Sequence, residues 1–179
     1  MNFANLLTIL RIIIIPIFIT TIKFNSSQIF KIMALCLFIV ASITDALDGI
    51  VARKFNLISN FGKFFDPLAD KILTITAMIC LVELKLINSI ILIIIITREF
   101  LVTSIRLAAS LHGKIIAANL AGKLKTITQI LAISFILFNY AFNLKGFFHQ
   151  TANLMLIVAT ILTIISGLIY FKQNQKFIT

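Results

Sequence analysis

Apolar segments long enough to cross a lipid bilayer follow one another along almost the whole chain, which is 60% hydrophobic. A bilayer core about 30 Å thick is crossed by a helix of roughly 20 mainly apolar residues. The polar breaks between the segments are short, and no Pro/Gly/Ser-rich linker separates them. We therefore predict one all-α, polytopic integral membrane domain over residues 1–179, because a soluble domain does not repeat segments of this length.

The apolar segments divide into six predicted transmembrane helices. They cover Leu6–Ile22, Ile29–Lys54, Gly62–Val82, Leu86–Ala109, Ala118–Phe142 and Gln150–Lys172. Pro16 predicts a kink in the first helix, because proline removes a helical hydrogen bond. No small-residue cleavage site follows this first segment, so we interpret it as a retained helix and not as a removed signal peptide.

The distribution of Lys and Arg predicts the orientation of the helices. Six helices place both termini on one face of the membrane. The face with the second-to-third connection, the fourth-to-fifth connection and the C-terminus receives ten Lys and Arg, and the other face receives four. By the positive-inside rule, the first face is cytoplasmic in a bacterial-type inner membrane. Anionic lipid headgroups account for the net charge of +10, so we expect no nucleic-acid partner.

All four aspartates of the chain, Asp45, Asp48, Asp66 and Asp70, lie within one 26-residue window. An aspartate at mid-membrane costs roughly 2.5–3.5 kcal/mol, so this group requires cations. Each pair shares one face of its helix, and two antiparallel helices could aim all four carboxylates into one pocket. Such oxygen ligands suit Mg²⁺ or Mn²⁺, and two ions about 4 Å apart form a clamp for displacement at phosphorus. Helix capping, which Asp66 before Pro67 favours, does not require four aspartates.

Two neighbours of the aspartates suit a phosphate-containing ligand. Gly49 lies on the aspartate face and has no side chain, so a ligand can approach the helix backbone there. Arg53 supplies a planar cation that matches phosphate oxygens. The sequence therefore favours chemistry on a phosphate ester beside the aspartates.

The segment Asp45-Ala-Leu-Asp-Gly-Ile-Val-Ala-Arg53, followed after eight residues by Gly62 and then by Asp66 and Asp70, resembles the signature of the CDP-alcohol phosphatidyltransferases at all eight fixed positions. That signature is D-x-x-D-G-x-x-A-R-x8-G-x-x-x-D-x-x-x-D. Members are six-helix membrane enzymes, usually dimeric, that displace CMP from a CDP-linked lipid or alcohol with divalent metal. The resemblance implies a homodimer and two bound Mg²⁺ or Mn²⁺ ions.

The resemblance also implies roles for the signature residues. Asp45, Asp48 and Asp66 would hold the first metal, and Asp66 would bridge to the second. Asp70 would ligate the second metal and act as the general base. The residues that would contact the CDP moiety and the diphosphate are Gly49, Arg53 and Ser59.

Three further segments resemble one branch of this family, the bacterial phosphatidylglycerophosphate synthases. They are Asn5–Arg11, Thr97–Phe100 with Arg106 two turns later, and Ala121–Thr126. The likeness implies CDP-diacylglycerol as donor, with Asn5 and Thr8 in its site, and sn-glycerol 3-phosphate as acceptor. It leaves open other acceptors with the same donor, namely serine, inositol phosphate or phosphatidylglycerol.

A phosphorylated acceptor needs cations that the aspartates do not already neutralise. The cations on the cytoplasmic half that are available to its phosphate are Arg98, Arg106, Lys123 and Lys125. Arg98 follows the apolar run Ile90–Ile96, and an ionisable group inside such a span is a functional candidate. Arg98 could instead pair with Glu99 or extend toward the membrane surface. Lys123 and Lys125 could instead serve only to set the orientation of the helices, as positive-inside residues do.

A transporter or channel is the rival class, since it also places charges within the membrane. Such proteins more often carry internal repeats with charges in both halves, whereas the acidic residues here are concentrated in one half. The enzyme interpretation further predicts an open lateral cleft, through which the donor's acyl chains remain in the bilayer.

Overall fold

The structure is a computed structural model that describes residues 3–24, 27–54, 60–111, 120–144 and 146–174. Within these ranges, the side chains of 3–9, 45–54, 60–70 and 110–111 are not described. The described residues form six helices and no strand. They are α1 (Phe3–Lys23), α2 (Gln28–Lys54), α3 (Asn60–Glu83), α4 (Ser89–Leu111), α5 (Leu120–Phe142) and α6 (Phe147–Asn174). The predicted all-α fold is confirmed for this part of the chain, and α1 continues through Pro16.

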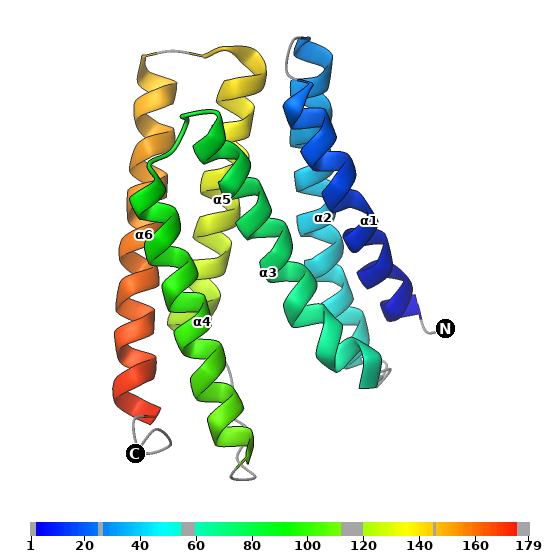
Figure 1. Cartoon of the computed structure of the whole chain (residues 1–179), viewed down its shortest axis with the longest axis vertical. Helices are drawn as coiled ribbons and strands as arrows, with labels where there is room; N and C mark the ends of the chain where they lie inside the picture. The colour runs from blue at the N-terminus through cyan, green and yellow to red at the C-terminus, as the bar shows by residue number, and fades with distance from the viewer. Residues whose placement is uncertain (1–2, 25–26, 55–59, 112–119, 145, 175–179) are drawn as a thin grey trace.

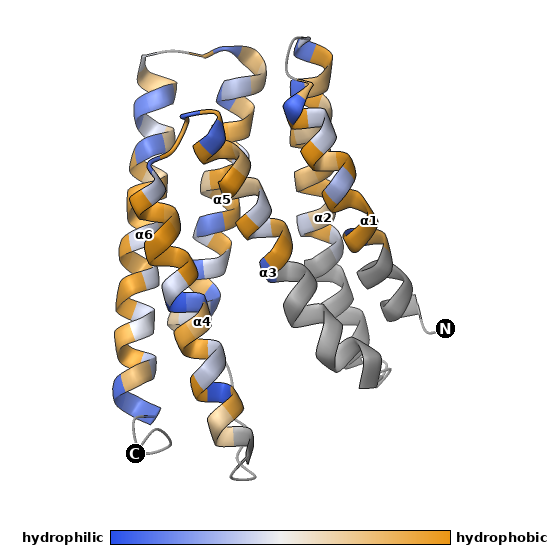
Figure 2. Ribbon diagram, viewed as in Figure 1, coloured by the Kyte–Doolittle hydropathy of each residue, from blue (hydrophilic) through white to orange (hydrophobic). Residues whose placement is uncertain are grey.

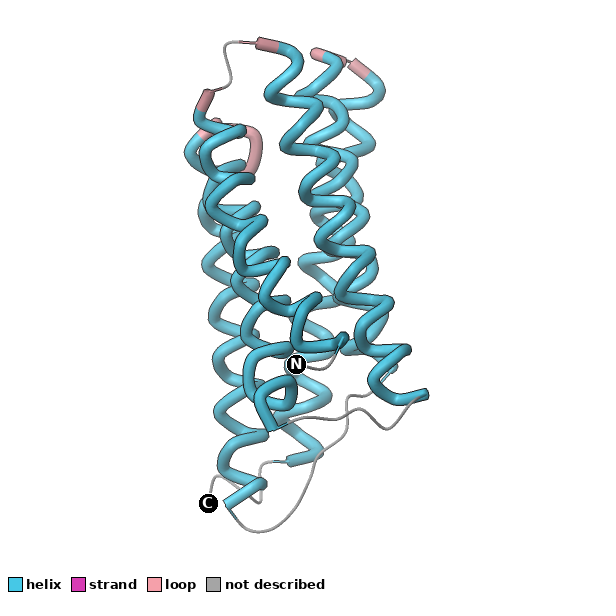
Figure 3. Tube along the Cα trace, turned by 90° about the vertical axis from the view of Figure 1, so that its right-hand side faces the viewer, coloured by secondary structure: helices cyan, strands magenta, loops and turns pink. Residues whose placement is uncertain are grey.

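The helices run alternately up and down the long axis of the molecule (Figure 1). The start of α1, the end of α2, the start of α3, the end of α4, the start of α5 and the end of α6 all lie toward the lower end. α1 packs on α2 and α3, α5 packs on α6 and α2, and α4 packs on α6 and α3. In the described part, no Cα atoms of α4 and α5 lie within 8 Å of each other. The side view shows the same elongated bundle (Figure 3).

Local hydrogen bonds satisfy the backbone groups at the end of α3 and at the start of α4. Lys85 has a φ of 58°, and the amides of Lys85 and Leu86 donate to the carbonyls of Val82 and Leu81 over 2.9 Å each. This is the Schellman arrangement, which satisfies carbonyls left over at a helix C-terminus. Asn88 then caps α4, because its Oδ1 accepts from the amide of Ile90 at 2.9 Å. The α3-to-α4 turn is therefore short and fixed.

α6 buries small and polar residues and exposes large apolar ones. The buried positions include Ala159, Thr163 and Ser166, whereas Leu154 and Leu168 are exposed. The buried hydroxyls donate to backbone carbonyls of their own helix; that of Thr163 donates to Ala159 over 2.7 Å. Figure 2 shows hydrophobic residues along all six helices of the bundle. This pattern is typical of helices that pack closely in lipid.

Two helices in the described part, α5 and α6, are long and apolar enough to cross a membrane. α4 has the length but carries three charged side chains, Arg98, Glu99 and Arg106, along it.

Candidate active site

The four aspartates lie on two helices that contact each other. Asp45 and Asp48 belong to the last turns of α2, and Asp66 and Asp70 to the first turns of α3. These helices are antiparallel neighbours, and the ends that carry the aspartates both lie toward the lower end of the bundle (Figure 1). The four side chains lie outside the described ones, so the shared pocket stays a prediction.

The other donor-site predictions also fall outside the described side chains. Asn5 and Thr8 belong to α1, and Gly49 and Arg53 belong to α2, while Ser59 lies outside the described residues altogether. Among the side chains that the structure does describe, no group of three His, Cys, Asp or Glu could hold a metal ion.

Arg98 and Lys125, two of the four cations expected at the acceptor phosphate, meet at the carboxylate of Glu99. Arg98 Nη1 donates to Glu99 Oε1 over 2.9 Å, and the ammonium of Lys125 forms an ion pair with the same oxygen. All three side chains are largely buried, with exposed fractions of 12%, 13% and 5% for Arg98, Glu99 and Lys125. The pairing of Arg98 with Glu99, which the sequence left open, is present.

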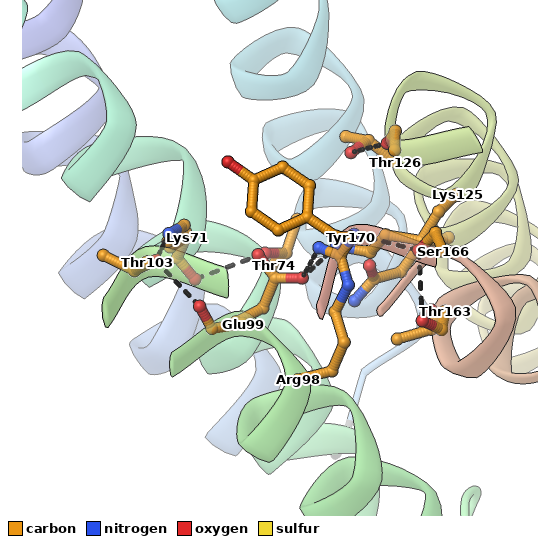
Figure 4. Close-up of polar contacts among 12 residues, drawn as sticks. Lys71, Thr74, Arg98, Glu99, Thr103, Lys125, Thr126, Thr163, Ser166 and Tyr170 are labelled. Carbon is orange, nitrogen blue, oxygen red and sulfur yellow. Dashed lines mark hydrogen bonds and ion pairs between the residues drawn. The ribbon is translucent and has the colours of Figure 1, made fainter. Parts of the chain in front are cut away.

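Arg98 also ties α4 to α6. Its Nη2 donates to the hydroxyl of Ser166 over 2.9 Å, and that hydroxyl donates in turn to the carbonyl of Thr163 over 3.0 Å. The stem of Arg98 passes directly over Gly167, where a Cβ atom would lie 2.9 Å from Arg98 Cγ. Figure 4 shows Arg98, Lys125, Ser166 and Thr163 gathered where α4, α5 and α6 approach one another.

The two remaining acceptor candidates lie apart from this cluster. Arg106 is two turns further along α4, where its Nε donates to the hydroxyl of Tyr170 over 3.0 Å and its guanidinium lies 5.4 Å from the centre of the Tyr170 ring. Lys123 is exposed on the first turn of α5. Glu99 therefore connects Arg98 to Lys125, whereas Arg106 contacts Tyr170 of α6, away from Glu99.

A second polar contact joins the aspartate-bearing helix α3 to α4. Lys71, which directly follows Asp70, donates from its ammonium to the hydroxyl of Thr103. That hydroxyl donates to the backbone carbonyl of Glu99 over 2.7 Å. A continuous set of contacts thus runs from the residue after Asp70 to the turn of α4 that carries Arg98 and Glu99 (Figure 4).

Several of these residues were not expected from the sequence. Ser166, Gly167 and Tyr170 on α6 and Thr103 on α4 contact the predicted cations or their neighbours. The small and polar stripe of α6 was the signal that could have indicated them, because such stripes mark the faces where membrane helices approach closely.

A groove with a volume of about 480 Å³ lies between α4 and α6. Its lining is almost entirely apolar and includes Leu101, Ile105 and Phe171, together with Arg98 and Gly167. The groove brings an apolar surface next to the stem of Arg98.

The described residues form an all-helical protein in which the helix ends that carry the four aspartates belong to α2 and α3. Comparison with known proteins identifies the class. Residues 1–165 match the CDP-alcohol phosphatidyltransferase family. The chain belongs to this family of phosphatidyl-group transferases, as the signature between Asp45 and Asp70 indicated.

The chain is also similar over nearly its full length to individual bacterial proteins. The CDP-diacylglycerol–glycerol-3-phosphate 3-phosphatidyltransferase of Bacillus subtilis (strain 168) is 43% identical, and the alignment covers 98% of this chain and 96% of that protein. The protein of the same name from Rickettsia felis is 38% identical over 98% of this chain and 97% of its own length. A probable phosphatidylglycerophosphate synthase of Mycobacterium tuberculosis is 36% identical over 98% of this chain and 82% of its own length.

Proposed function

We propose that this chain transfers the phosphatidyl group of CDP-diacylglycerol to sn-glycerol 3-phosphate, giving phosphatidylglycerophosphate and CMP. The observation that carries the proposal is the 43% identity, over 98% of this chain, to a protein named for this reaction. The unbroken signature between Asp45 and Asp70 supports the same chemistry. The chain acts as a single domain in phospholipid biosynthesis.

The residues present fit a divalent metal cofactor. Four carboxylates, on Asp45, Asp48, Asp66 and Asp70, supply the hard oxygen donors that Mg²⁺ and Mn²⁺ prefer, and their helices α2 and α3 are antiparallel neighbours. Two ions bound there would stabilise the charge that develops at the transferring phosphorus. This donor set has no counterpart among the described side chains.

Asp70 is the proposed general base. It accepts the proton of the acceptor hydroxyl as that oxygen attacks the phosphorus next to diacylglycerol. The new phosphorus–oxygen bond forms while the bond to the CMP oxygen breaks, so CMP leaves with the electron pair. The residues proposed to hold the donor's CDP moiety are Asn5, Thr8, Gly49, Arg53 and Ser59.

The acceptor phosphate is proposed to bind the cations of α4 and α5. Arg98 and Lys125 both contact Glu99 Oε1. Arg106 lies on α4 two turns nearer the lower end of the bundle, to which the aspartate-bearing helix ends also belong. Lys123 adds an exposed cation two residues before Lys125. The buried Nε of Arg98 makes no hydrogen bond within the described part, so it remains available to a ligand oxygen.

The proposed location is a bacterial inner membrane, with six transmembrane helices and with both termini and the active site in the cytoplasm. Large apolar residues are exposed on every helix whose side chains are described, which suits a lipid environment. The proposed homodimer rests on the family resemblance alone.

A purified preparation distinguishes the possible acceptors. The protein is incubated with CDP-diacylglycerol, Mg²⁺ or Mn²⁺ and one radiolabelled acceptor at a time: glycerol 3-phosphate, serine, inositol phosphate or phosphatidylglycerol. We expect labelled phosphatidylglycerophosphate and an equal amount of CMP with the first. Faster transfer to another acceptor would reject the proposed substrate while keeping the reaction class.

A further inference from the structure

Glu99 is the one described acidic side chain among the cations proposed to bind the acceptor phosphate. Its Oε1 accepts from Arg98 Nη1 at 2.9 Å and pairs with the ammonium of Lys125. A carboxylate repels a phosphate dianion, so Glu99 is unsuited to be a ligand of the acceptor. Any effect of Glu99 on acceptor binding must therefore act through the two cations that it contacts.

The ion pair bridges two helices, α4 and α5, whose Cα atoms all lie more than 8 Å apart in the described part. The side chain of Lys125 spans this separation to reach Glu99. A lysine side chain has four rotatable bonds, and fixing it costs conformational entropy. A buried carboxylate at the far side supplies the partner that keeps the extended conformation populated.

The carboxylate itself stands on a fixed turn of α4. The hydroxyl of Thr103 donates to the Glu99 carbonyl over 2.7 Å and accepts from Lys71 of α3. On the other side, Ser166 of α6 accepts from Arg98 Nη2 over 2.9 Å. Contacts from α3 and α6 thus hold the turn from which Glu99 reaches Lys125 (Figure 4).

We infer that Glu99 is a positioning residue, which holds the Lys125 ammonium and the Arg98 guanidinium in the arrangement that binds the phosphate of the acceptor. The inference rests on the proposed function, and it deepens that function by identifying a residue that gives the site its preference for a phosphorylated acceptor. Glu99 makes no contact with the substrate in this role.

The test is the variant Glu99→Gln, which keeps the shape of the side chain and removes its charge. Initial rates are measured with glycerol 3-phosphate varied at saturating CDP-diacylglycerol, and with the two substrates exchanged. We expect the KM for glycerol 3-phosphate to rise about tenfold or more, while kcat and the KM for CDP-diacylglycerol change by less than about twofold. Such a split is not produced by general loss of structure.

Glu83→Gln is the matched control, because Glu83 is the only other glutamate in the chain. It pairs with Lys23 over 3.8 Å at an exposed position far from the cluster. Its KM values should equal those of the wild type. A lower KM for glycerol 3-phosphate in Glu99→Gln would mean that Glu99 only repels the acceptor, and equal damage to kcat and both KM values would mean a structural role; either overturns the inference.

A double variant keeps the test decisive if Glu99→Gln fails to fold with two buried cations left beside a neutral amide. Lys125→Gln and the pair Glu99→Gln/Lys125→Gln are compared, because the pair leaves only Arg98 charged. Arg98 keeps its hydrogen bond to Ser166 when Glu99 is changed, so most of the effect of Glu99 should pass through Lys125, and the double variant should have a KM for glycerol 3-phosphate close to that of Lys125→Gln. A KM for the double variant about tenfold or more above that of Lys125→Gln would overturn the inference. An inactive wild-type protein would instead reject the proposed function itself.

Discussion

The side chain of Arg98 on α4 crosses α6 directly over Gly167, so closely that a Cβ atom at position 167 would lie 2.9 Å from Arg98 Cγ. This close approach brings the guanidinium to Ser166, to which Nη2 donates over 2.9 Å. The absence of a side chain at position 167 therefore sets how near α4 and α6 come beside the proposed acceptor site.

Gly167→Ala should separate α4 from α6 or displace the Arg98 stem. Overpacking of this kind typically costs about 1–3 kcal/mol, so thermal unfolding in detergent should shift to lower temperature. The KM for glycerol 3-phosphate should rise at the same time, because the guanidinium moves. Ile165→Leu on the exposed face of α6 is the control and should change neither quantity. An unchanged unfolding temperature in Gly167→Ala would contradict the tight crossing.

The helices were predictable from the sequence because apolar length alone defines them. The predicted end of the fifth helix at Phe142 agrees with α5, and the predicted third helix differs from α3 by two residues at its start. α6 begins at Phe147, three residues before the predicted start at Gln150.

The contacts between distant helices were less predictable. Neighbours in sequence, such as Arg98 and Glu99, were recognised as a possible pair. Ser166, however, is 68 residues from Arg98, and nothing in the local sequence indicates that α4 packs on α6. Helix pairing depends on the shape of both faces together, which a pattern on one helix does not contain. The aspartate pairs were placed correctly on α2 and α3, and their roles stay predictions.

Removal of divalent metal should stop the reaction. If the aspartates of α2 and α3 hold Mg²⁺ or Mn²⁺, EDTA should abolish CMP release from CDP-diacylglycerol, and either ion in excess should restore it. CMP release is followed by chromatography, and circular dichroism of the chelated protein controls for loss of helix. Full activity in chelator would exclude the metal-dependent mechanism.

The proposed topology can be tested at two exposed positions at opposite ends of the bundle. Lys172 lies near the end of α6 and Ser89 begins α4. In a background without Cys36 and Cys80, Lys172→Cys should react with an impermeant maleimide only from the cytoplasmic side, and Ser89→Cys only from outside. The reverse labelling would place the aspartates away from cytoplasmic substrates.

Arg106→Gln should weaken acceptor binding. A guanidinium binds phosphate oxygens in a bidentate manner that an amide does not reproduce, so the KM for glycerol 3-phosphate should rise roughly tenfold or more. Tyr170→Phe is the matched control, since it removes only the hydroxyl that accepts from Arg106 Nε at 3.0 Å. It should have a smaller effect. An equal increase in the KM for CDP-diacylglycerol would assign Arg106 to the donor side instead.

Asp70→Asn separates the proposed general base from the proposed metal ligands. Asparagine keeps the size and one oxygen ligand of Asp70 but is a far weaker base, so kcat should fall by roughly two to four orders of magnitude while labelled CDP-diacylglycerol still binds. Asp45→Asn should instead weaken metal-dependent donor binding with less effect on kcat, because Asp45 is proposed to hold the first metal, which we assign to the donor. Both quantities are measured for each variant, kcat from CMP release and affinity from equilibrium binding. Near-normal turnover in Asp70→Asn would transfer the role of base to another group, because a residue that accepts the proton cannot lose its basicity without slowing the chemical step.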